Sequence, residues 1–186
     1  MAIWGGGSVD SPATSYLYTL AIISMTFTGF AAVVMLLRQT LRSQLRAFDA
    51  LFARVYMEFG LIATIGAMLP PLLMFWELSP AAVWRVSSSI LGIPLLVFVL
   101  TYPARRRAAS NEPTPRYVRA NLAILLVISL TFLLAAAGVL HERSGRIFLT
   151  ALTVFLTFAV GTWLRALKLI LVPDQAGVPN RRRART

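Results

Sequence analysis

Five long apolar segments, separated by short segments that contain arginine, constrain this chain more than any other feature. An α-helix rises about 1.5 Å per residue, so about 17 to 25 apolar residues cross a hydrocarbon core about 30 Å thick. Backbone amides in lipid must be hydrogen-bonded within the protein, which favours helices. The sequence therefore predicts an all-α integral membrane protein with five spans. The predicted spans are residues 16–37, 54–76, 86–102, 120–140 and 147–172.

The composition excludes an ordinary soluble domain. Of the 186 residues, 58% are hydrophobic and 13% are charged, whereas a soluble domain has about 25% charged residues. A soluble chain of this size cannot bury so much apolar surface. The chain contains no cysteine, which excludes disulfides and thiolate metal sites but does not reveal the compartment.

The distribution of basic residues predicts how the chain is threaded. Fifteen of the 18 Lys and Arg residues lie in residues 38–54, 103–119 and 165–186, on one side of the predicted spans. The positive-inside rule places this side in the cytoplasm. We therefore expect the N-terminus outside, the C-terminus inside and, because the loops are short, antiparallel neighbouring helices. Residues 1–15 would form a mobile outer tail and residues 173–186 a basic cytoplasmic tail.

The formal net charge of +11 is better explained by contact with anionic lipid headgroups than by nucleic acid, because the basic residues lie in short blocks between apolar segments. Arginine recurs every four residues between positions 38 and 46, while leucine and phenylalanine occupy another helical face. This spacing predicts a basic helix over residues 38–52 that lies at the interface. An ordinary basic loop is the alternative. The arginines assigned to headgroups are Arg38, Arg42, Arg46, Arg105, Arg106 and Arg107.

The second apolar segment carries Glu58, an acidic residue within a long apolar run. Arg54 precedes it by four residues and therefore lies on the same helical face. A carboxylate in a membrane segment is costly and usually faces protein or water. Glu58 is thus a candidate proton or cation site. Because it lies only about 6 Å along the axis from Arg54, near the edge of the span, a structural ion pair is the favoured interpretation.

Three prolines inside the spans predict kinks. Pro70 and Pro71 in the second span leave the carbonyl groups of Gly66 and Ala67 without their usual helical donors. Pro94 does the same near the middle of the third span. In lipid, such carbonyl groups need other partners from neighbouring helices, side chains or water.

Small and hydroxyl side chains form one face of the fifth span. Thr150, Thr153, Thr157 and Gly161 follow helical spacing. Such a face favours close helix–helix packing, and lining of a polar path is the alternative. Ser24 and Thr28 in the first span have the same ambiguity.

The sequence contains no nucleotide-binding loop, nucleophile elbow or zinc-protease motif. We therefore expect no enzyme activity, no cofactor and no metal site. The favoured function is that of a packing, accessory or scaffold component of a membrane assembly in a bacterial inner membrane. The expected partner is a second copy of the chain or another membrane protein. The alternative is a small oligomeric channel or proton-coupled transporter with Glu58 on or near the path. Substrate and partner cannot be predicted from the residues.

Overall fold

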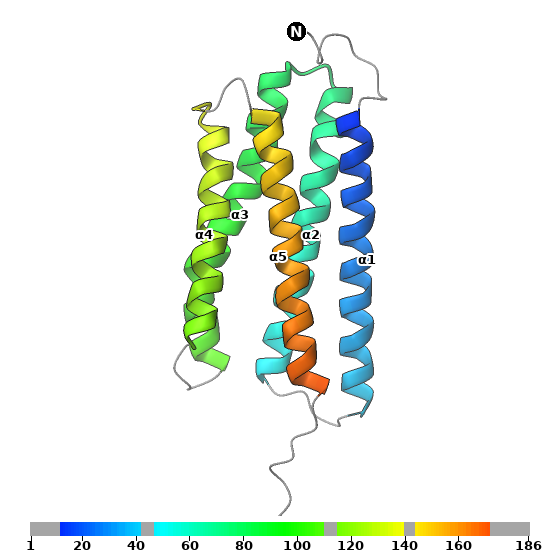
Figure 1. Ribbon diagram of the computed structural model, residues 1–186, viewed down its shortest axis with the longest axis vertical. Helices are drawn as coiled ribbons and strands as arrows, with labels where there is room; N and C mark the ends of the chain where they lie inside the picture. Colours follow the sequence, from blue (N-terminus) through cyan, green and yellow to red (C-terminus); the bar gives the residue numbers. More distant parts are fainter. Residues whose placement is uncertain (1–11, 42–46, 110–114, 140–143, 172–186) are drawn as a thin grey trace, which may run out of the picture.

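The computed structural model describes residues 12–41, 47–109, 115–139 and 144–171. Within these ranges all the regular elements are helices (Figure 1). All five helices are long and apolar enough to cross a membrane, so the chain is a polytopic membrane protein. The helices are α1 (Pro12–Leu41), α2 (Ala47–Phe75), α3 (Pro80–Ala109), α4 (Arg116–Ala136) and α5 (Ser144–Leu171).

The helices extend beyond most of the predicted spans. For example, α3 begins at Pro80 and ends at Ala109, whereas the predicted span covers residues 86–102. Helical hydrogen bonding continues past the apolar core because polar and basic side chains also form good helices. In the other direction, α4 ends at Ala136, where Gly138 takes a positive φ of 79° in the following turn. Glycine adopts this conformation without steric cost.

The sequence predicts a separate helix over residues 38–52, but the described part of this segment belongs to two other helices. Residues 38–41 continue α1, and residues 47–52 form the first turns of α2. Both flanks keep the apolar spacing of the helices that they extend, so each continues its neighbour. Residues 42–46, and with them Arg42 and Arg46, lie outside the described residues, as do 1–11 and 172–186.

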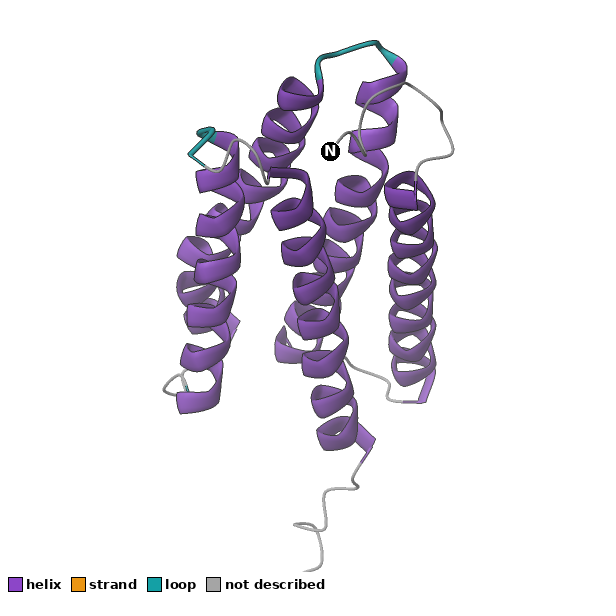
Figure 2. Ribbon diagram, turned by 45° about the horizontal axis from the view of Figure 1, so that its top comes forward, coloured by secondary structure: helices purple, strands orange, loops and turns teal. Residues whose placement is uncertain are grey.

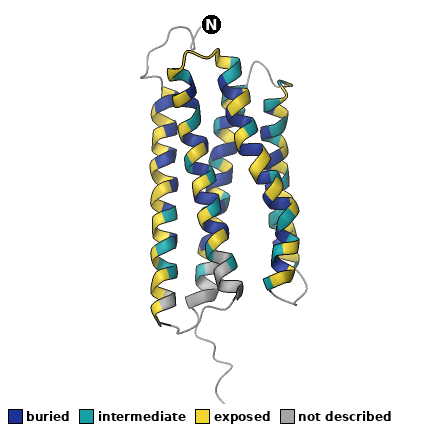
Figure 3. Cartoon of the chain, turned by 180° about the vertical axis from the view of Figure 1, so that it is seen from behind, coloured by how far each residue is buried: buried dark blue, intermediate teal, exposed yellow. Residues whose placement is uncertain are grey.

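Helices that are neighbours in sequence form the most extensive contacts, with α1 on α2 and α3 on α4 (Figure 2). The helix α5 contacts all four of the others. Buried side chains face the middle of the bundle, while large apolar side chains such as Ile22, Phe30 and Leu100 are exposed around it (Figure 3). This outward apolar surface is the one expected to face lipid.

Aromatic rings form much of the core. Phe59 packs edge-on against Phe98 and Phe155, with centroid distances of 4.7 and 5.5 Å. Nearer the other end, Phe148 packs edge-on against Phe132 and in a tilted arrangement against Trp84, both with centroid distances of 5.5 Å. Edge-to-face pairs of this kind add specific geometry to the burial of apolar surface, so they fix how α2, α3, α4 and α5 pack.

Small residues bring the helices close together. A Cβ atom at Gly60 of α2 would overlap the Thr28 hydroxyl of α1 and lie 2.9 Å from the Thr28 Cβ. One turn further along this contact, the Ser24 and Thr64 hydroxyl groups are 2.9 Å apart and hydrogen-bonded. We call this contact the α1–α2 seam. It supports the packing interpretation of Ser24 and Thr28, since such seams are typical of membrane helices.

The contact between α3 and α4 has the same character. The Ser129 hydroxyl donates a hydrogen bond of 2.9 Å to the Gly92 carbonyl oxygen, and both residues are buried. A Cβ atom at Gly92 would lie 3.1 Å from the Phe132 Cβ. A polar group in the membrane needs a partner, and here the close approach of the two backbones provides it.

The helix α2 remains helical through Pro70 and Pro71, and α3 remains helical through Pro94. Each proline removes one backbone donor, but none ends its helix. Pro70 is fully buried. The kinks at these positions stay predictions.

Candidate functional site

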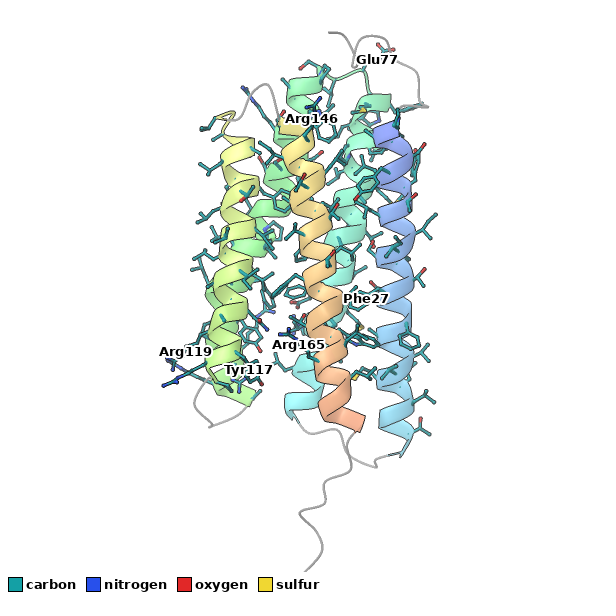
Figure 4. The ribbon with its side chains drawn as sticks, viewed as in Figure 1. Phe27, Glu77, Tyr117, Arg119, Arg146 and Arg165 are labelled. Carbon is teal, nitrogen blue, oxygen red and sulfur yellow. The ribbon has the colours of Figure 1, made fainter. Side chains whose placement is uncertain are left out.

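The two ends of the bundle differ in character (Figure 4). Arg119 and Arg165 lie at one end, and Glu77 and Arg146 lie at the other. Arg54 and Arg105 lie at the same end as Arg119 and Arg165, and both bind Glu58 there. We call it the arginine end. At this end, residues from the first turns of α2 and α4 and from the last turns of α3 and α5 line one cavity.

Glu58 binds two arginines at the arginine end. The Nε of Arg54 donates to its Oε1 at 2.8 Å, within α2. The Nη1 of Arg105, on α3, donates to Oε1 at 3.2 Å and to Oε2 at 3.1 Å. The side chain of Glu58 is 28% exposed, that of Arg105 is 34% exposed and that of Arg54 is 69% exposed. The carboxylate therefore connects α2 to α3 within a half-buried cluster.

This arrangement favours the structural interpretation of Glu58. Both carboxylate oxygens accept from guanidinium groups, and charge-assisted hydrogen bonds of this kind are stronger than neutral ones. The Arg54 contact was predicted from its four-residue spacing. The Arg105 contact was not, because 47 residues separate it from Glu58 and no local pattern joins the two.

The arginines that were assigned to lipid headgroups lie in different surroundings. Arg105 binds Glu58, Arg106 is only 3% exposed, and Arg107 is exposed. Burial of Arg106 was not anticipated, because a run of three arginines at a helix end resembles a solvated basic segment. The side chain of Arg38 is outside the description, and contact of any of these arginines with headgroups stays a prediction.

The hydroxyl face of α5 is divided between two surroundings. Thr153 bonds the Tyr16 hydroxyl of α1 at 2.8 Å. Thr150, Thr157 and Gly161 are exposed, and the two threonine hydroxyls donate to backbone carbonyl groups four residues earlier. Of these four residues, therefore, Thr153 alone contributes to helix packing within the chain.

A cavity of about 110 Å³ lies between α2, α3, α4 and α5 at the arginine end. We call it the tyrosine cleft, because three tyrosines contribute to its lining. Among its lining residues Tyr117 and Arg165 are exposed, whereas Phe59, Phe98 and Leu125 are buried. The cleft thus opens toward the arginine end, where α4 and α5 diverge (Figures 1 and 2). The polar lining residues are Tyr56, Tyr102, Tyr117, Asn121, Thr162 and Arg165.

The lining of the cleft becomes less polar with depth. Along α5 it changes from Arg165 to Thr162 to Phe158. The Thr162 hydroxyl donates to the backbone carbonyl oxygens of Phe158 and Ala159, both at 3.0 Å, and its side chain also bonds Tyr56. Arg165 and Tyr117 lie on facing helices near the opening, while Arg119 points away from it (Figure 4). Within the part of the lining that the structure describes, the one charged residue is thus a cation at the mouth.

Sequence reasoning missed the tyrosine cleft. Tyr117, Asn121 and Leu125 follow an i, i+4, i+8 spacing on α4, which places them on one face with polarity falling along the helix. This signal was present but weak, since tyrosines near span ends are typical of membrane interfaces. The contribution of Tyr56 and Tyr102 depends on the packing of four helices and leaves no local pattern.

Within the described parts of the chain, no group of three or more His, Asp or Glu side chains is placed to hold a metal ion. No known protein family, curated protein or solved structure matches the chain.

Proposed function

We propose that this chain is a non-enzymatic accessory or scaffold protein that associates with a partner within the membrane. The supporting observation is the exposed small-residue face of α5. A Cβ atom at Gly161 would meet nothing within 4 Å, and Thr157 is exposed one turn earlier. Membrane helices associate through such small residues, because their backbones can approach closely there.

The remaining polar groups within the membrane support the same proposal. The pairs Ser24–Thr64 and Ser129–Gly92 hold helices of this chain together. Glu58, which the channel alternative places on a conduction path, binds Arg54 and Arg105 at the arginine end. A transporter site is expected nearer the middle of the bilayer. This geometry therefore favours the accessory function over the channel.

Replacing Gly161 with leucine is expected to lower the native mass of the complex extracted from its own membranes. The leucine side chain would block close approach at the α5 face, while the chain itself would fold normally, since the site is open and leucine favours helix by about 1 kcal/mol over glycine. Native mass spectrometry of the gently solubilised complex measures the change and identifies each polypeptide present.

Gly29 provides a matched control, because it also lies on an exposed helix surface with nothing within 4 Å of its Cβ position. Gly29→Leu is expected to leave the native mass unchanged. If both variants keep the wild-type mass, the α5 face is not an interface. If only Gly29→Leu lowers it, the contact is made by α1.

The distribution of arginine supports an N-out, C-in orientation in a bacterial inner membrane. In this orientation the arginine end faces the cytoplasm. A reporter enzyme that works only outside the cytoplasm is expected to be active when fused to the N-terminus and inactive when fused to the C-terminus. The opposite result would reverse the orientation.

A further inference from the structure

We propose that the tyrosine cleft binds one acyl chain of an anionic phospholipid, with the lipid phosphate at Arg165. This inference assigns a ligand to the cleft and is independent of the proposed association through α5. It depends on three properties of the cleft, which are its polarity along the membrane normal, its charge and its size.

The polarity of the lining matches that of a lipid in a leaflet. Arg165 is exposed and lies at the arginine end of α5 (Figure 4), where a long basic side chain can reach the headgroups. Thr162 lies about 4.5 Å deeper and Phe158 about 10 Å deeper, given a rise of about 1.5 Å per residue. On α4, Tyr117, Asn121 and Leu125 repeat the change from polar to apolar. Two facing helices thus present a cation, then hydroxyl and amide groups, then apolar side chains.

The charge of the cleft favours an anionic head. Among the described residues that line it, none is acidic and Arg165 is the only charged one. The arginines Arg54 and Arg105 are bound to Glu58, whereas Arg165 has no ion-pair partner in the described residues. A guanidinium group binds phosphate oxygens in a bidentate manner. Arg165 is therefore placed to hold the phosphate at the mouth while the Tyr117 and Asn121 side chains lie beside the ester region.

The size of the cleft limits what enters it. A cavity of about 150 Å³ holds a benzene molecule, so the cleft of about 110 Å³ holds a segment of a single chain. The rest of that chain would lie outside the cleft, in the hydrocarbon core of the bilayer. The second chain of the lipid remains in the bilayer. The buried side chains of Phe59, Phe98 and Leu125 would contact the bound segment.

The test uses the full chain in a non-ionic detergent with equal amounts of phosphatidylglycerol, phosphatidylcholine and oleate, the two lipids carrying the same acyl chains. Native mass spectrometry measures how much of each molecule is retained. Phosphatidylglycerol is expected to be retained preferentially. Arg165→Gln is expected to weaken its retention by roughly tenfold, since a charge-assisted contact contributes about 1.5–3 kcal/mol and 1.4 kcal/mol is tenfold.

Arg119→Gln is the matched control, because Arg119 is exposed at the same end but points away from the cleft (Figure 4). It is expected to change retention less than twofold. An equal loss in both arginine variants would show general attraction to the basic surface and overturn the proposal. Equal retention of the two phospholipids, or preferential retention of oleate, would overturn the assignment to an anionic phospholipid.

A second variant tests the position of the acyl chain. Leu122 lines the cleft and is only half-buried, so Leu122→Trp fills the cleft without entering the aromatic core. We expect it to abolish retention of phosphatidylglycerol while the melting temperature and elution volume stay those of the wild type. Full retention in a folded Leu122→Trp variant would show that the lipid binds elsewhere.

Discussion

Replacing Gly60 with leucine is expected to open the α1–α2 seam and lower the melting temperature of the detergent-solubilised protein by about 2–12 °C. Even the first carbon of the new side chain would overlap the Thr28 hydroxyl and lie 2.9 Å from the Thr28 Cβ. The Thr28 hydroxyl is held by a hydrogen bond of 2.8 Å to the Ser24 carbonyl oxygen, so rotation does not relieve the overlap cheaply. Overpacking costs about 1–3 kcal/mol or more, and about 1 kcal/mol lowers the melting temperature by about 2–4 °C in a chain of this size.

Two controls separate the seam from the general effect of a new leucine. Gly29→Leu on the open face of α1 is expected to keep or slightly raise the melting temperature, because leucine favours helix over glycine. In a double-mutant cycle with Gly60→Ala, the change Thr28→Ala is expected to recover part of the loss. An unchanged melting temperature in Gly60→Leu would mean that α1 does not pack on α2 at this position.

Glu58→Gln is expected to lower the free energy of unfolding by about 1–2 kcal/mol. The amide keeps the size of the carboxylate but removes its charge, which leaves Arg105 half-buried without its anionic partner. Breaking a fully buried ion pair costs about 3–5 kcal/mol, and the 28% and 34% exposure of the two side chains reduces that cost. Thermal unfolding followed by circular dichroism measures the change.

The two arginines of the cluster supply a graded comparison. Arg54 is 69% exposed, and exposed ion pairs contribute about 0–1 kcal/mol. Arg54→Gln is therefore expected to have a smaller effect than Arg105→Gln. A larger effect of Arg54→Gln would contradict the assignment of Arg105 as the main partner. A Glu58→Gln variant of wild-type stability that alters proton or ion flux in liposomes would instead favour the channel alternative.

The spans were predictable because each feature that defines them is local. An apolar segment of about 20 residues is recognised from its own composition. The contact between Arg54 and Glu58 is likewise predicted from their four-residue spacing alone. The structure shows five helices long and apolar enough to cross a membrane, and it shows the Arg54–Glu58 ion pair. The bounds of the helices were less predictable, because α3 continues into the basic run at Arg105 where hydropathy alone ends the span.

The contacts between helices were not predictable in the same way. The Arg105–Glu58 ion pair, the Tyr16–Thr153 hydrogen bond and the lining of the tyrosine cleft all join residues far apart in the sequence. Each depends on the rotation of one helix about its axis relative to another. The spacing of Thr150 and Gly161 does not show which role their face has, because the same spacing suits packing within the chain, packing against a partner or a polar path.

The order in which the helices contact one another has a consequence for how the chain enters the membrane during synthesis. The most extensive contacts join α1 to α2 and α3 to α4, so each pair can form as soon as its second helix has been inserted. The helix α5 is made last and touches all four others. Until it arrives, two hairpins are held together chiefly by α2 and α3, and the surfaces around Phe59 and Phe132 that α5 covers would face lipid. Chains that stop before α5 are therefore expected to be the forms that membrane quality-control proteases remove first.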